Sequence, residues 1–348
     1  MNEDTGYIGI GRVVSFMTTG RRAFLERAVT TATVATMVVA GWPTVAAQED
    51  GDETDLPAYS RWLTLEADVL EFTYVDWATL EEYVAEELEQ ASPDEDVPEE
   101  YRTDPMVAPA SDGLIMAYFF IGLTLGQFGL GRLLDEGEFE SVAEELVRVD
   151  GTFVVTGDLV TTELDERLTR EPVADFIVQM ERTDEVGGYD VYTPVEEGAD
   201  VVIALEDDAL LVVDGDETDE EPETALETAI DAAAGDVTRA TEESESLAWL
   251  LETAGSGDVA VGQYGGPFDT DDLRHQAFEG LEDAEGIVSS FTVEDEETLI
   301  GDFAAIVPDP DEDALEAFVG ASADERTIDV EGDRVTATGT WREEVRYE

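Results

Sequence analysis

The sequence predicts an α+β fold of two ferredoxin-like units, each an antiparallel sheet with helices on one face. Short segments with alternating apolar and polar residues follow residue 150, and this period is typical of half-buried strands. Segments with helical spacing interrupt them in the order β-α-β-β-α-β with one extra strand, which is the ferredoxin-like plan. The pattern that opens at Gly151 begins again at Gly257, which indicates a divergent internal duplication.

The repeated pattern, together with the N-terminal signal, divides the chain into four segments. Residues 1–47 form a signal segment, and residues 48–150 form a mixed segment with a buried, glycine-rich helix. The two α+β units are expected over 151–256 and 257–348.

The N-terminus has the features of an export signal. Four of the arginines lie at or before Arg27, and a weakly apolar stretch follows over 28–41. Small residues lead up to Ala47, so cleavage is expected after Ala47; retention as a membrane anchor is the alternative. Met17 directly precedes the motif, so residues 1–16 are interpreted as an extension of the gene model. The residues of the twin-arginine motif are Arg21, Arg22, Phe24 and Leu25.

The charge balance is extreme. The chain has 87 acidic and 17 basic residues, all of the latter arginine, and its net charge is -70. Such a chain repels itself in ordinary buffer, whereas molar salt reduces the screening length to about 3 Å. We therefore expect a halophilic protein with salt cations as loosely bound counterions. The same balance excludes nucleic acid and anionic lipid surfaces as partners.

The segment before residue 113 combines loops with short regular elements. Residues 48–56 are an acidic leader, and residues 59–73 form a region of short strands. Apolar residues at three- and four-residue spacings predict a helix over 77–88. Four prolines predict a loop over 92–109.

An uncharged run, GLIMAYFFIGLTLGQFGLG, occupies residues 113–131. Its length qualifies it as a transmembrane segment. Its glycines, the internal Gln127 and the closely flanking Asp112 and Arg132 favour instead a helix buried in a folded core.

The elements of the two units follow from local patterns. A polar cap at Thr162 predicts a short helix. A second helix is predicted between Pro222 and Gly235, and a third helix is predicted to end at Gly255. The strands of the first unit are expected over 152–157, 176–182, 189–193, 201–205 and 210–213. In the second unit, strands are expected over 259–262, 287–293, 299–307, 327–330 and 335–341, with helices after Asp269 and Asp309.

Six motifs follow the Arg-Arg signal, at residues 59–63, 72–76, 129–135, 154–159, 187–192 and 230–232. Together with the signal they resemble a group of exported haloarchaeal proteins of unknown function. This resemblance implies location and fold, and it brings no established activity. Where the related chains place a cysteine after the signal for lipid attachment, this chain has none.

No catalytic, cofactor-binding or metal-binding residue is predicted. The chain lacks cysteine, and its single histidine, His275, is expected to be structural. The acidic run 309–313 resembles the start of a calcium loop, but Ala314 and Gly320 stand where glycine and glutamate are needed. A helix start with Asp309 as its cap explains this run better.

We therefore expect an exported, non-enzymatic protein that binds or organises something at the cell surface, with a protein partner there or in the membrane. One alternative is a carboxylate-based extracellular hydrolase, which a deep pocket with two carboxylates and an aromatic floor would favour. The other is a membrane-anchored accessory subunit, which an exposed apolar helix over 113–131 would favour.

Overall fold

In the computed structural model, the described part of the 348-residue chain begins at Leu56 and ends at Arg342. The predicted signal residues Arg21, Arg22, Phe24 and Leu25, the cleavage site after Ala47, and His275 lie outside the described residues. The residues described are 56–81, 83, 99–135, 137–172, 174, 176–196, 199–215, 218, 220–266, 278, 281, 283–295 and 298–342.

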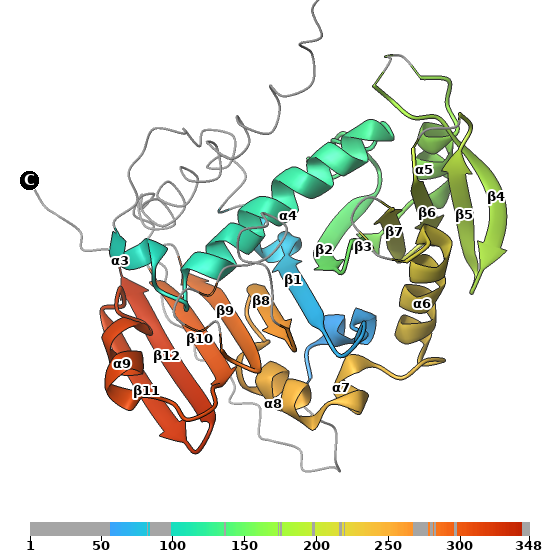
Figure 1. Cartoon of the computed structure of the whole chain (residues 1–348). Helices are drawn as coiled ribbons and strands as arrows, with labels where there is room; N and C mark the ends of the chain where they lie inside the picture. The colour runs from blue at the N-terminus through green and yellow to red at the C-terminus, as the bar shows by residue number, and fades with distance from the viewer. Residues whose placement is uncertain are drawn as a thin grey trace, which may run out of the picture.

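The strands form one continuous antiparallel sheet (Figure 1). They are β1 (Leu70–Asp76), β2 (Val142–Val149), β3 (Thr152–Asp158), β4 (Met180–Val186), β5 (Tyr189–Pro194), β6 (Val201–Leu205), β7 (Ala209–Asp214), β8 (Val259–Tyr264), β9 (Gly286–Asp295), β10 (Thr298–Ile306), β11 (Glu325–Glu331) and β12 (Arg334–Arg342). The order of the 12 strands is β11-β12-β10-β9-β8-β1-β2-β3-β7-β6-β5-β4.

The predicted fold class is therefore wrong: there are not two ferredoxin-like units with helices on one face. Strand β1 pairs with β2 on one side, through Phe72 and Val149, and with β8 on the other, through Phe72 and Gly262. It thereby joins the strands on its two sides into a single sheet. Alternating patterns indicate which residues form strands, but they do not specify pairing between strands that are distant in the chain.

Helices cover both faces of the sheet. They are η1 (Ala58–Trp62), α3 (Glu99–Arg102), α4 (Ala108–Gln127), α5 (Thr161–Leu168), α6 (Pro222–Ala234), α7 (Ala240–Glu243), α8 (Glu245–Ala254) and α9 (Glu312–Phe318). One apolar layer contains residues of α4, α5 and α9, and the other contains residues of η1, α6, α7 and α8.

Helix α4 contains residues 113–127 of the uncharged run, and it lies across β9, β8, β1 and β2 (Figure 1). At Gly113 the helix backbone approaches the sheet so closely that a Cβ would overlap Val261 and Thr73. The helix is long and apolar enough to cross a membrane, yet 59% of its most apolar window is buried in the fold. Its apolar residues thus pack as in a core helix, although Leu123 is 56% exposed.

Helix α9 begins two residues later than predicted. Its N-cap is Asp311, whose Oδ1 accepts a hydrogen bond from the Ala314 N–H at 3.2 Å, and not Asp309. Asp309 has a φ of 51° and belongs to the preceding turn. The acidic run over 309–313 is therefore a helix start, as expected, with a different capping residue.

Candidate functional site

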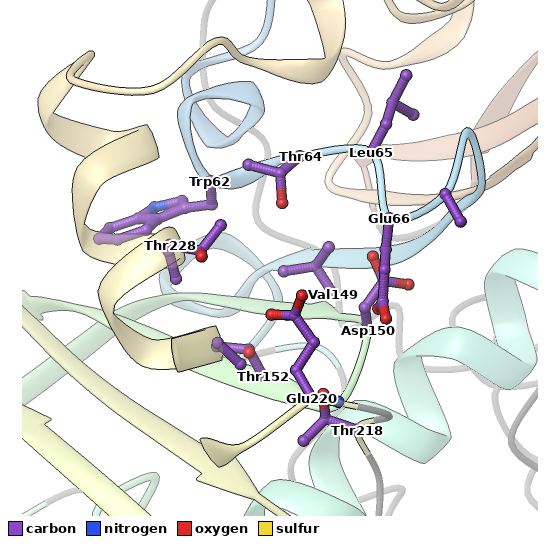
Figure 2. A pocket seen from close by; sticks show the side chains of 13 residues that line it. Trp62, Thr64, Leu65, Glu66, Val149, Asp150, Thr152, Thr218, Glu220 and Thr228 are labelled. Carbon is purple, nitrogen blue, oxygen red and sulfur yellow. Dashed lines mark hydrogen bonds between the residues drawn. The ribbon is translucent and has the colours of Figure 1, made fainter. Parts of the chain in front are cut away.

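A pocket of about 190 Å³ lies where η1 and α6 meet the ends of the central strands (Figure 2). Its polar walls consist of three carboxyl side chains and four threonines, and Leu65, Val149 and three alanines supply apolar surface. The carboxyl residues are Glu66, Asp150 and Glu220, and the threonines are Thr64, Thr152, Thr218 and Thr228.

Asp150 reaches the pocket because of the turn between β2 and β3. Asp150 and Gly151 both have positive φ, 43° and 79°, which is the conformation of a two-residue type I′ hairpin turn. Val149 and Thr152 pair across this turn, and both line the pocket. An Asp-Gly pair between alternating apolar residues is a strong hairpin signal, and it could have located this turn from the sequence.

A second tight turn, over residues 66–69, lies beside the first. Glu66 and Val69 exchange backbone hydrogen bonds of 3.0 and 2.9 Å around Ala67 and Asp68. Ala67 and Asp68 have φ values of 50° and 68°, and a residue other than glycine is strained by about 1–3 kcal/mol in this region. Asp68 itself lines a neighbouring open groove, which shares Leu65 with the pocket.

This strain is concentrated around the pocket. Among the described residues, four that are not glycine have positive φ, and the fourth is Asp309. The other three belong to the two turns just described. Strained backbone of this kind is typical of ligand-binding sites, where the surrounding structure must enforce it.

The Asp150 carboxyl has an unusual electrostatic environment. Its pKa is raised to about 7, chiefly by burial and to a lesser extent by the nearby carboxylates Glu66 and Glu71, against the opposing effects of the Glu71 N–H and of Arg148. The Glu71 N–H donates to Oδ1 of Asp150 across 3.4 Å, which is a long hydrogen bond. Among the described residues, Oδ2 has no hydrogen-bond donor. Asp150 thus presents an oxygen without a protein partner to the pocket.

The pocket offers recognition groups and few catalytic ones. Its lining residues include no cysteine, histidine, lysine or serine, and no three acidic or histidine side chains of the described residues are placed to hold a metal ion. Trp62 lines the pocket but is only 2% exposed, and the Arg61 guanidinium lies 4.9 Å from its ring centre. Its indole is therefore packed into the core and does not provide a stacking surface for a ligand.

None of these lining residues was predicted from the sequence to have a functional role. In a chain with 87 acidic residues, a pair of carboxylates has no predictive value, because some pair is always present. Only the fold shows that Asp150 differs from most of them in its burial and neighbours.

No protein-family model matches the chain, and no curated protein matches it. Among solved structures, crystal form I of TP0453 is similar over 81% of this chain and 92% of that chain, with 13% sequence identity and a TM-score of 0.42. A similarity at this level supports no functional conclusion.

Proposed function

We propose that this chain is an exported, halophilic protein that acts at the cell surface by binding a small polar ligand, and not by catalysis. The observation that carries the proposal is the pocket around Asp150, in which a carboxyl oxygen without a hydrogen-bond donor among the described residues and threonine hydroxyls line one partly open space. A carboxylate oxygen that no protein group occupies is free to accept a hydrogen bond from a donor on a bound ligand. Export rests on the twin-arginine motif, and halophily rests on the net charge of -70.

The carboxylate-based hydrolase is the second candidate, and one observation favours it. A pKa of about 7 at Asp150 suits a general acid, and Glu66 and Glu220 line the same pocket. Two features oppose it. The pocket of about 190 Å³ is smaller than the roughly 300–1,000 Å³ of common ligand sites, and Trp62 does not form an open aromatic floor.

Export is tested by replacing Arg21 and Arg22 with lysine. Lysine keeps the positive charge but lacks the planar guanidinium, so we expect the double variant to stay inside the cell. Cell fractionation measures this, and mass spectrometry of the exported wild type should find Gln48 as the first residue. Equal export of the double variant would contradict the proposal, and an intact N-terminus would instead indicate a retained anchor.

Ligand binding is tested by filling the pocket. Ala225 lines it from α6, whereas Ala234 is exposed at the end of the same helix. Thermal unfolding of the wild type in molar salt is measured with ethylammonium, glycine, glycerol and acetate as probes of different charge. A bound probe at about 100 times its Kd stabilises the fold by about 2.7 kcal/mol.

We expect at least one probe to stabilise the wild type and Ala234→Leu, and to have no effect on Ala225→Leu. If no probe acts on the wild type, or if Ala225→Leu responds like Ala234→Leu, the pocket is not a binding site. The hydrolase is tested separately with Asp150→Asn. Hydrolysis of sugar or peptide substrates by the wild type that Asp150→Asn abolishes would establish catalysis.

A further inference from the structure

We propose that the ligand of the Asp150 pocket is a short primary alkylammonium ion, bound through its –NH3+ group to Asp150. This inference rests on the proposed function and names the chemical class of its ligand. It combines the hydrogen-bonding groups of the pocket, their charge, and the apolar part of the wall.

The hydrogen-bonding groups of the pocket match a primary ammonium. An –NH3+ group has three donors and no acceptor. The pocket provides an open acceptor at Oδ2 of Asp150, and the hydroxyls of Thr152 and Thr228 can also accept. In Figure 2 the side chain of Glu220 extends from its loop into the space framed by these three residues.

The charge of the walls selects a cation. Among the described residues, every ionisable side chain that lines the pocket is a carboxyl, and Glu71 lies close enough to raise the pKa of Asp150. Arg148, among the described residues, acts on Asp150 in the opposite direction. An anionic ligand would be repelled by these carboxyl groups, whereas a cationic one would be attracted to them. Inside a pocket, salt screens these interactions much less than it does at an exposed surface.

The apolar part of the wall distinguishes an alkylammonium from an inorganic cation. Leu65, Val149, Ala225 and Ala229 cover part of the pocket, and they suit methylene groups better than they suit a hydrated ion. Among the described residues no acidic cluster is placed to hold a metal ion. The volume of about 190 Å³ corresponds to about six water molecules at about 30 Å³ each, which is enough for an amine of a few heavy atoms.

Binding should release a proton. Burial and the carboxylates around Asp150 favour its neutral form, whereas a bound ammonium favours the ionised form. Below a pH of about 7 the ligand must displace the carboxyl proton, and above it no proton is displaced. Affinity should thus rise roughly 20-fold from about pH 5.5 to about pH 7.5 and then level off. The ligand stays charged over this range, because an alkylammonium titrates near a pKa of about 10.

The experiment is isothermal titration calorimetry of the full chain in molar KCl at several pH values. Propylammonium is the probe, and 1-propanol is a neutral control of the same shape. We expect propylammonium to bind with the predicted rise in affinity and with uptake of the released proton by the buffer at low pH. We expect 1-propanol not to bind.

Asp150→Asn is the matched variant, and Asp329→Asn on the exposed strand β11 removes the same charge far from the pocket. Asp150→Asn should weaken binding at least tenfold and abolish its pH dependence, whereas Asp329→Asn should leave both unchanged. Asp150→Asn should also melt at a higher temperature than the wild type at pH 8, which shows that the variant folds.

The outcomes separate this inference from the proposed function. If glycerol or glycine binds in the pocket and propylammonium does not, the binding function stands and the alkylammonium inference is wrong. If none of the probes binds, both are wrong. Affinity for propylammonium that is independent of pH, or equal in Asp150→Asn and Asp329→Asn, would also overturn the inference.

Discussion

In dilute buffer we expect the chain to lose its cooperative fold, and in about molar salt to regain it. Two like charges about 7 Å apart in water repel each other by about 0.6 kcal/mol. Dozens of such pairs among 87 acidic residues exceed the roughly 5–15 kcal/mol by which domains are stable. At a screening length of about 3 Å, only about a tenth of each repulsion is left. Circular dichroism during stepwise dialysis from molar to about 0.1 M KCl measures the transition.

Glu206, Asp207 and Asp208 provide a local test of this explanation. The three acids lie together at the turn between β6 and β7, and burial together with Asp208 and Asp207 raises the pKa of Glu206. Changing Asp207 and Asp208 to asparagine should therefore lower the salt concentration at the unfolding midpoint. The backbone bonds that their carbonyls accept from Leu159 and Gly157 are retained in the variant.

Acidification should stabilise the fold, as salt does. Burial is the first cause of the raised pKa values of Asp150, Glu206 and Asp258, so the folded chain binds protons more tightly than the unfolded chain at these positions. The stability that comes from tighter proton binding at Asp150 is fully present below a pH of about 3.8, and it is lost as the pH rises to about 7. At intermediate salt the fold should thus be more stable at pH 6 than at pH 8. The salt experiment tests the same explanation. If the chain stays cooperatively folded in dilute buffer, with the same unfolding transition as in molar salt, the electrostatic explanation is refuted.

Local elements could be predicted from the sequence because their causes are local. Strand β6 occupies the predicted residues 201–205, and α6 begins at Pro222 and is followed by Gly235 with a φ of 80°, as its capping residues indicate. These elements depend on alternation, on a fixed proline φ and on a left-handed glycine, all of which are visible in a few neighbouring residues.

The arrangement of the strands could not be predicted, because it depends on contacts between distant residues. A Cβ at Gly262 would overlap the ring of Phe72, so the pairing of β8 with β1 needs a glycine opposite this aromatic residue. The sequence shows both residues but does not show that they meet. The site could not be predicted for the same reason. The environment of Asp150 is formed by η1, α6 and the β2–β3 turn, which are distant from one another in the sequence.

Asp104 forms a second buried carboxylate site, and its hydrogen bonds are complete. The residue lies in a segment predicted only as a proline-rich loop, and it is 0% exposed. Its Oδ1 accepts from the N–H groups of Met106 and Gly320, at 3.0 and 2.9 Å. Its Oδ2 accepts from the N–H and the hydroxyl of Ser322, at 2.9 and 2.6 Å. The Ser322 hydroxyl also accepts from the Trp341 indole N–H at 2.9 Å, so one carboxylate connects the start of α4 to the loop after α9 and to β12.

We expect Asp104→Ala to destabilise the fold by about 3–5 kcal/mol, because it leaves two buried N–H groups and the part-buried N–H and hydroxyl of Ser322 without their acceptor. Asp311→Ala is the control: it removes the exposed cap of α9, whose loss should cost about 1 kcal/mol. Asp104→Asn keeps one acceptor oxygen but points an NH2 donor at other donors. Its loss of stability should therefore lie between those of Asp104→Ala and Asp311→Ala. Urea unfolding in molar salt measures all three without changing the ionic strength. Asp104→Ala and Asp311→Ala variants of equal stability would show that this carboxylate does not hold the start of α4 to β12.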